Sequence, residues 1–183
     1  MVFTIHDCGF AARLAVEDTG ARELRLDKIV RIIRDSRYSI HDISRVELGE
    51  SKLPRFNMPF EAGLAMGAIR FEPERADGQS RDFLLLDAVP YRDKMTLSDL
   101  AGQDPKTHNN ETSKIISAVR TFLAAKAREV PVRGATAIIA RYESFVRALP
   151  KLAQKVEVTI DELNSFDYLP DRIALMVGWL RAQ

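Results

Sequence analysis

The sequence is poor in the residues that build metal sites and disulfides, and it carries almost no net charge. Cys8 is the single cysteine, so the chain cannot form an internal disulfide, and His6, His41 and His108 have no close ligand spacing. We therefore expect no metal site. The 27 Lys and Arg residues are balanced by 26 Asp and Glu residues, which gives no electrostatic reason to expect nucleic acid or a membrane as a partner.

Long apolar runs and phosphate-binding loops are also missing. No apolar stretch reaches about 18 residues, and no basic segment followed by an apolar run opens the chain, so we expect a cytoplasmic protein. The first apolar run is followed by a single glycine, Gly9, where a dinucleotide-binding loop would need three. The P-loop, zinc-protease and serine-hydrolase motifs are missing as well, and we expect no bound cofactor.

What is present is the pattern of an α/β protein. The chain of 183 residues is 46% hydrophobic and has nine Phe, enough for a sizeable core in one domain with a small helical appendage. Apolar spacing predicts strands and helices in alternation over the first half: a strand at 2–5, helices at 8–17 and 26–36, a strand at 38–44, a helix at 59–69 and a strand at 83–86. This order is typical of a parallel sheet with helices on both sides.

The second half is predicted to be mostly helical. Residues 87–110 form a long, polar, mostly irregular segment, of the kind that is often functional. Helices are expected at 111–128, at 134–149, from residue 159 or 160 onward, and at 170–180. The sequence from Thr159 to Glu162 has the polar start and following acid of a helix cap.

Glu61 is the most prominent candidate for a functional residue. It lies near the start of the helix at 59–69, among small residues that allow a ligand or a backbone to approach closely. Rigid placement of this kind suits a nucleophile or an electrostatic stabiliser. The alternative is that Glu61 is an ordinary first-turn acid, favoured there by the helix dipole.

Further polar side chains are expected at the same edge of the sheet. In an open parallel sheet, ligands bind beyond the carboxyl ends of the strands. The predicted strands would deliver polar residues to this edge, and the loop before the helix would add two more: His6, Asp7, Asp42, Ser44, Asp87, Arg55 and Asn57.

Several of these residues also have ordinary structural interpretations. Asp42 and Ser44 are equally suited to cap the loop after their strand, and His6 to be a hydrogen-bonded core histidine. Arg55 is either a surface residue or an ion-pair partner of a nearby acid. Cys8, beside His6, is more often a small buried side chain than a nucleophile.

These residues resemble a known group of proteins. A polar pair after the first strand, Asp-x-Ser after the next, and the run from Asn57 to Gly67 look like Toll/interleukin-1 receptor (TIR) domains and nucleoside 2-deoxyribosyltransferases. Phe60-Glu61-Ala62-Gly63-Leu64-Ala65 is similar to the Phe-Glu-x-Gly-x-Ala pattern of the transferases, and residues 98–102 look like a loop found in some members. The resemblance covers roughly residues 1–125.

The resemblance implies a fold and an activity. The fold would be α/β, a flavodoxin-like open parallel sheet with flanking helices, in a domain of residues 1–130, with a C-terminal helical extension at 131–183 packed on it. In the transferases the glutamate is the nucleophile, and bacterial TIR-like proteins use a corresponding glutamate to cleave NAD. Glu61 would then be the catalytic residue, as nucleophile or as stabiliser of an oxocarbenium-like sugar.

The same resemblance implies roles for the other residues and leaves alternatives open. Asp42, or His6 with Asp7, would hold ribose hydroxyls or assist proton transfer to the departing base, and Arg55 and Asn57 would meet a phosphate or ribose oxygen. The segment 55–59 departs from the transferases, whose approach to the glutamate has an aspartate and glycines, so substrate carries over less well than fold. The alternative function is a non-catalytic nucleotide-sensing or assembly module, and self-association into a homo-oligomer fits either.

Overall fold

The computed structural model describes residues 1–16, 23–44, 56–72, 78–97, 102–127 and 131–183. The chain divides into two compact units, one formed by residues 20–118 and the other by residues 1–19 together with 119–183. The domain boundary expected at residue 130 stays a prediction. Among the described helices, none has both the length and the apolar character needed to span a bilayer.

The unit of residues 20–118 is built on a small parallel sheet. Its described strands are β1 (Tyr38–Asp42), β2 (Asp82–Asp87) and β3 (Lys106–Thr107), in the order β1-β2-β3. Asp42 is in register with Leu86, and Asp87 with Thr107, so the carboxyl ends of neighbouring strands lie side by side. The mixed α/β class and the parallel sheet predicted from the sequence are confirmed.

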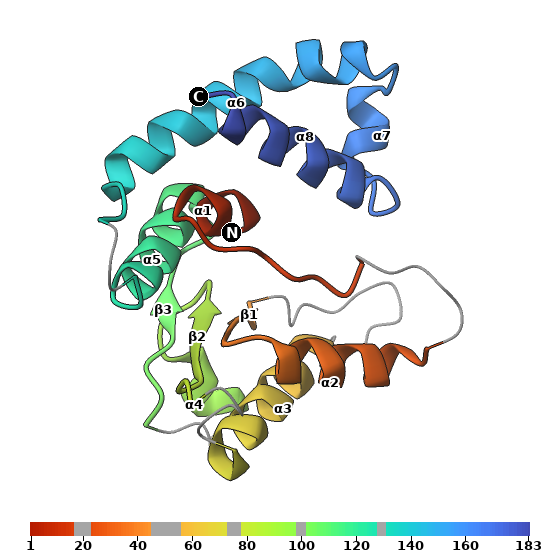
Figure 1. Ribbon diagram of the computed structural model, residues 1–183. Coiled ribbons are helices and arrows are strands. Elements are labelled where there is room, and N and C mark those ends of the chain that lie inside the picture. Colours follow the sequence, from red (N-terminus) through yellow and green to blue (C-terminus); the bar gives the residue numbers. More distant parts are fainter. Residues whose placement is uncertain (17–22, 45–55, 73–77, 98–101, 128–130) are drawn as a thin grey trace. The chain divides into compact units, whose positions relative to one another are not determined.

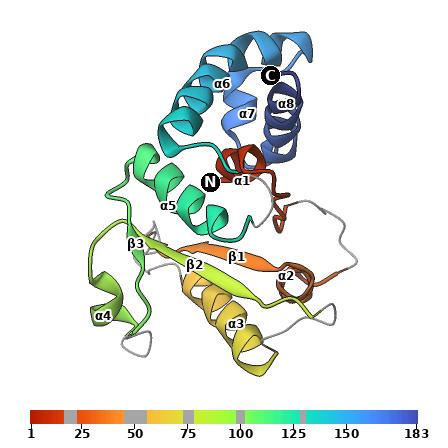
Figure 2. The ribbon, with the colours of Figure 1, turned by 60° about the vertical axis from the view of Figure 1, so that its left-hand side comes forward.

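Helices flank this sheet because each crossover between parallel strands has to return along one of its faces. Helix α3 (Asn57–Phe71) connects β1 to β2 and packs against both, and α2 (Arg25–Asp35) packs against α3 (Figure 2). The short α4 (Arg92–Thr96) lies between β2 and β3 in sequence. Buried Ile43, Ala62 and Leu85 form a core cluster that joins α3 to the ends of β1 and β2.

The other unit is helical. It contains α1 (Val2–Asp7), α6 (Ala135–Lys155), α7 (Ile160–Asn164) and α8 (Leu169–Arg181), and α1 contacts both α6 and α8 (Figure 1). The rings of Tyr142, Phe145 and Trp179 surround Phe3 at centroid distances of 5.4, 5.8 and 6.2 Å. Helix α5 (Thr112–Ala124) begins in the sheet-containing unit and ends in the helical one.

Two predictions for the start of the chain are wrong. The strand expected at residues 2–5 is the helix α1, because Phe3, Thr4 and Asp7 are buried at helical spacing. The helix expected at residues 8–17 is not formed over residues 8–16. Gly9, at φ +83°, ends α1 instead: its own N–H bonds to the His6 carbonyl, and the Phe10 N–H bonds to the Ile5 carbonyl.

The remaining elements agree with expectation more closely. The strands at 38–44 and 83–86 and the helices at 26–36, 59–69, 111–128, 134–149 and 170–180 are confirmed, with ends shifted by up to six residues. The segment 87–110, expected to be mostly irregular, contains α4 and β3. The loop at residues 98–102 that carries part of the resemblance lies outside the described residues except for Gly102.

Candidate functional site

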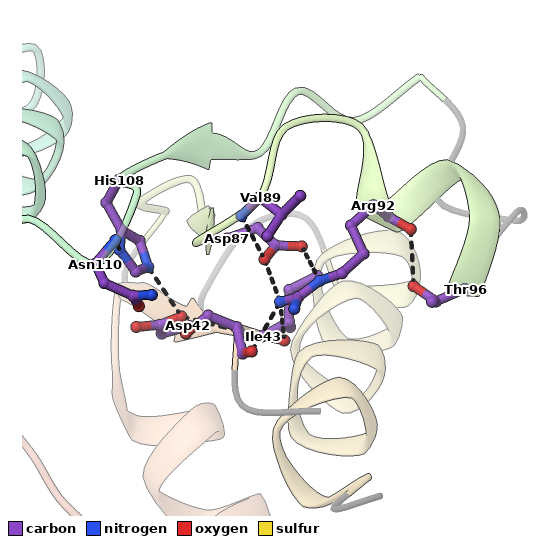
Figure 3. Close-up of polar contacts among 9 residues, drawn as sticks. Asp42, Ile43, Asp87, Val89, Arg92, Thr96, His108 and Asn110 are labelled. Atoms are coloured by element: carbon purple, nitrogen blue, oxygen red, sulfur yellow. Dashed lines mark hydrogen bonds and ion pairs between the residues drawn. The ribbon is translucent and has the colours of Figure 1, made fainter. Parts of the chain in front are cut away.

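Polar side chains converge where the three strands end. Asp42 is the last residue of β1, Asp87 is the last residue of β2, and His108 directly follows β3 (Figure 3). Backbone hydrogen bonds extend the pairing past the strands, since the Ile43 N–H bonds to the Leu86 carbonyl at 2.9 Å and the His108 N–H bonds to the Asp87 carbonyl at 2.9 Å. The three side chains are therefore presented from one continuous edge, which we call the carboxyl edge.

Asp87 and Arg92 form a buried ion pair at this edge. The Arg92 Nε donates to Asp87 Oδ2 at 3.2 Å, and its Nη2 is in close contact with Oδ1. The Asp87 side chain is only 2% exposed. The same Nη2 also donates to the carbonyls of Ser44, at 2.8 Å, and Ile43, at 3.3 Å (Figure 3). Nε and Nη2 of Arg92 are thus both engaged, and Nη2 holds the chain that leaves β1.

Asp42 has different surroundings. Its Oδ1 accepts a hydrogen bond from the Ser44 backbone N–H at 3.0 Å and lies 3.4 Å from Nε2 of His108. The His108 side chain is 2% exposed, whereas that of Asp42 is 21% exposed. Ser44 therefore contributes its backbone N–H to Asp42, and the Asp42 side chain keeps contact with solvent.

Glu61 lies on the second turn of α3, one residue before Ala62 in the core cluster with Ile43 and Leu85. This turn of α3 is consequently held against the chain that directly follows Asp42. The Glu61 carboxylate is 17% exposed and lies 3.6 Å from Nη2 of Arg25, whose side chain is 68% exposed. The carboxylate therefore faces α2, and its ion pair is long and open to solvent.

Asn57 and Arg55, the two polar residues expected before Glu61, make no contact with Glu61 that the structure describes. Asn57 is the first residue of α3 and is exposed. Arg55 lies outside the described residues, so its proposed role stays a prediction. An arginine that was not considered, Arg25, occupies the place of an ion-pair partner for Glu61.

His6 and Asp7 lie on α1 in the helical unit and do not follow a strand. Asp7 pairs with Arg141, whose Nε donates to Oδ1 at 2.9 Å, and lies 3.8 Å from Arg133. Burial, and then the charge of Arg181, lowers the pKa of His6. The ion pair between Asp7 and Arg141 anchors α1 to α6, which is a structural role.

Sequence reasoning missed the two residues that organise the edge, Arg92 and His108. Arg92 lies five residues after Asp87, the acid that ends β2. An arginine at this distance from an acid at the end of a buried strand is a signal that the sequence offers. His108 had no such signal, because β3 spans only Lys106–Thr107. Its proximity to Asp42 depends on strand pairing across 66 residues.

The chemistry of this edge is that of hydrogen-bond acceptors. Within the described ranges, no three side chains of His, Cys, Asp or Glu come together in a way that could hold a metal ion. Asp42 and Glu61 are the partly exposed carboxylates, and they suit hydroxyl groups or developing positive charge.

Neither a family model, nor a curated protein, nor a solved structure matches the chain.

Proposed function

We propose that this chain acts on the N-glycosidic bond of a nucleotide such as NAD, by hydrolysis or transfer, with Glu61 as nucleophile or oxocarbenium stabiliser. On this proposal the sheet-containing unit is a small flavodoxin-like domain of the TIR and deoxyribosyltransferase type. The observation that supports it most is the core cluster of Ile43, Ala62 and Leu85. It ties the helix turn of Glu61 to the strand end that carries Asp42.

The surroundings of Glu61 are compatible with this role. Cleavage of the bond places positive charge on the sugar ring, and a carboxylate close to the ring stabilises that charge. The contact between Glu61 and Arg25 is 3.6 Å long, and Arg25 is largely exposed. Because the contact is long and Arg25 is largely in solvent, a ligand that draws Arg25 away would free the carboxylate.

The test compares Glu61→Gln with the wild type. We expect Glu61→Gln to slow release of nicotinamide from NAD by at least about a hundredfold, because the amide cannot stabilise a developing cation. Release is measured by chromatography, and the folded state is checked by thermal denaturation. Glu72→Gln is the matched control, because Glu72 is an exposed acid at the other end of α3. Equal rates for Glu61→Gln and the wild type would remove Glu61 from the mechanism.

A second candidate is an assembly module that binds a nucleotide without cleaving it. The observation that favours it is a pair of exposed aromatic side chains at the start of α3, Phe56 at 64% and Phe60 at 55% exposure. Spaced by four residues, they lie on one side of the helix. An assembly module would show nucleotide-dependent thermal stabilisation without product, and a mass in solution that falls when Phe60 is replaced by Ser.

A further inference from the structure

We propose that His108 is a positioning residue, which holds Oδ1 of Asp42 so that Oδ2 accepts a hydrogen bond from a sugar hydroxyl of the ligand. The assignment of a sugar rests on the proposed function. The positioning itself rests on contacts at the carboxyl edge alone.

The imidazole of His108 is fixed in one protonation pattern by its two neighbours. The backbone N–H of Asn110 donates to Nδ1 at 3.1 Å, so Nδ1 is an acceptor and carries no proton. In a neutral imidazole the proton is then on Nε2, the atom that faces Asp42 Oδ1 at 3.4 Å (Figure 3). At 2% exposure the ring has little access to water as a substitute partner.

The turn that supplies the Asn110 N–H has an unusual backbone. Asn109 and Asn110 are consecutive non-glycine residues in the left-handed region, at φ +51° and +59°. Side chains other than glycine adopt this region rarely, although asparagine does so more readily than most. Such conformations persist where the surrounding structure enforces them, and they cluster at functional sites. Here the turn places the Asn110 N–H against His108.

The two oxygens of Asp42 are therefore used differently. Oδ1 has two donors, the Ser44 N–H and Nε2 of His108. No donor to Oδ2 is found within the described part of the chain, and the side chain is 21% exposed. Arg92 holds the carbonyls of Ile43 and Ser44, which keeps the Ser44 N–H in place. Oδ2 is thus an acceptor of fixed orientation to which no donor in the described ranges bonds.

The chemistry of Oδ2 selects its ligand group. A carboxylate oxygen accepts hydrogen bonds and repels phosphate and carboxylate groups. The charge of Arg92 is largely balanced by the buried carboxylate of Asp87, which its Nε and Nη2 contact. A hydroxyl group of the nucleotide sugar is the donor that the proposed function supplies.

The first experiment needs no ligand. A long-range ¹H–¹⁵N spectrum of the labelled full chain reports which nitrogen of each histidine carries the proton, and the His108→Gln variant assigns the signal. We expect the proton on Nε2 of His108 and an unprotonated Nδ1. A proton on Nδ1 with Nε2 unprotonated would overturn the positioning role, whatever the protein acts on.

The second experiment compares two substitutions with the wild type, using ADP-ribose for binding and NAD for turnover. His108→Gln keeps an N–H donor near the position of Nε2, whereas His108→Leu removes it. We expect His108→Leu to weaken ADP-ribose binding and raise KM about tenfold, equivalent to 1.4 kcal/mol, with kcat within about threefold. His108→Gln should stay close to the wild type in both measurements. Both variants lose the Nδ1 acceptor of the Asn110 N–H, so they should melt at similar temperatures to each other, below the wild type.

The outcomes separate the two proposals. Equal losses in His108→Gln and His108→Leu, or no loss in either, would overturn the positioning role. If the wild type neither binds ADP-ribose nor cleaves NAD, the sugar assignment fails with the proposed function, while the ¹H–¹⁵N spectrum still decides the role of His108. Removing one sugar hydroxyl from the ligand should abolish the difference between His108→Leu and the wild type.

Discussion

The three histidines lie in three different environments. His108 is hydrogen-bonded at Nδ1 and faces Asp42 with Nε2. His41 is buried in β1, and its Nε2 finds no hydrogen-bond partner among the described residues. His6 lies on α1 near Arg181. The sequence showed that these residues lack the spacing of metal ligands, but it did not distinguish their three environments.

His41 should make the stability of the protein depend on pH. Burial lowers its pKa from 6.5 to about 4. The unfolded chain therefore takes up a proton near pH 6.5, and the folded chain takes it up only near pH 4. Stability is fully present above pH 6.5 and is lost as the pH falls toward 4. The difference corresponds to about 3 kcal/mol of unfolding free energy.

The measurement is urea unfolding between pH 7.5 and about 4, in the wild type and in His41→Leu. The variant has no group that titrates at this position, so its decline should be smaller by about 3 kcal/mol. His6→Gln is the control for the other histidine with a lowered pKa. Parallel pH curves for the wild type and His41→Leu would show that His41 is protonated alike in both states.

At the scale of elements, local sequence patterns predicted most of the helices. They failed where contacts with residues distant in sequence determine whether a segment is a helix or a strand. Residues 2–5 are a short apolar run, which a strand and a buried helix can share. The choice is made by Tyr142, Phe145 and Trp179, which contact Phe3 from α6 and α8. Nothing within a few residues of Phe3 could indicate these partners.

The start of α7 is a case where local sequence was sufficient. Thr159 and Glu162 form the predicted capping box: the Thr159 Oγ1 accepts the Glu162 N–H at 3.2 Å, and the Glu162 carboxylate accepts the Thr159 N–H at 2.7 Å. Both partners lie within four residues of sequence. The motif is therefore readable without any knowledge of tertiary contacts.

Thr159→Ala should destabilise the helical unit by about 1 kcal/mol, because the Glu162 N–H loses its acceptor. Thr159→Ser keeps the hydroxyl and is the matched control, expected within a few tenths of a kcal/mol of the wild type. The free energies are measured by chemical denaturation, followed by the fluorescence of Trp179 in the same unit. Equal stability of Thr159→Ala and Thr159→Ser would show that the cap contributes nothing.

At the scale of the molecule, the sequence predicted the parallel sheet and therefore the edge where polar residues gather. Asp42 and Asp87 followed from this topology, because each ends a strand. His6 and Asp7 were assigned to the same edge only because a helix was taken for a strand. His108 could not be assigned to it, since the pairing of a two-residue strand leaves no periodic signal.

The central claim is that a nucleotide binds at the carboxyl edge, beside Asp42 and Glu61. The most direct measurement is the change in backbone amide NMR shifts of the full chain on titration with ADP-ribose. We predict the largest changes at residues 42–44, 57–64, 87–92 and 107–111. Changes confined to the opposite ends of the strands, near residues 36–39 and 79–82, or no change at saturating ADP-ribose, would contradict the account.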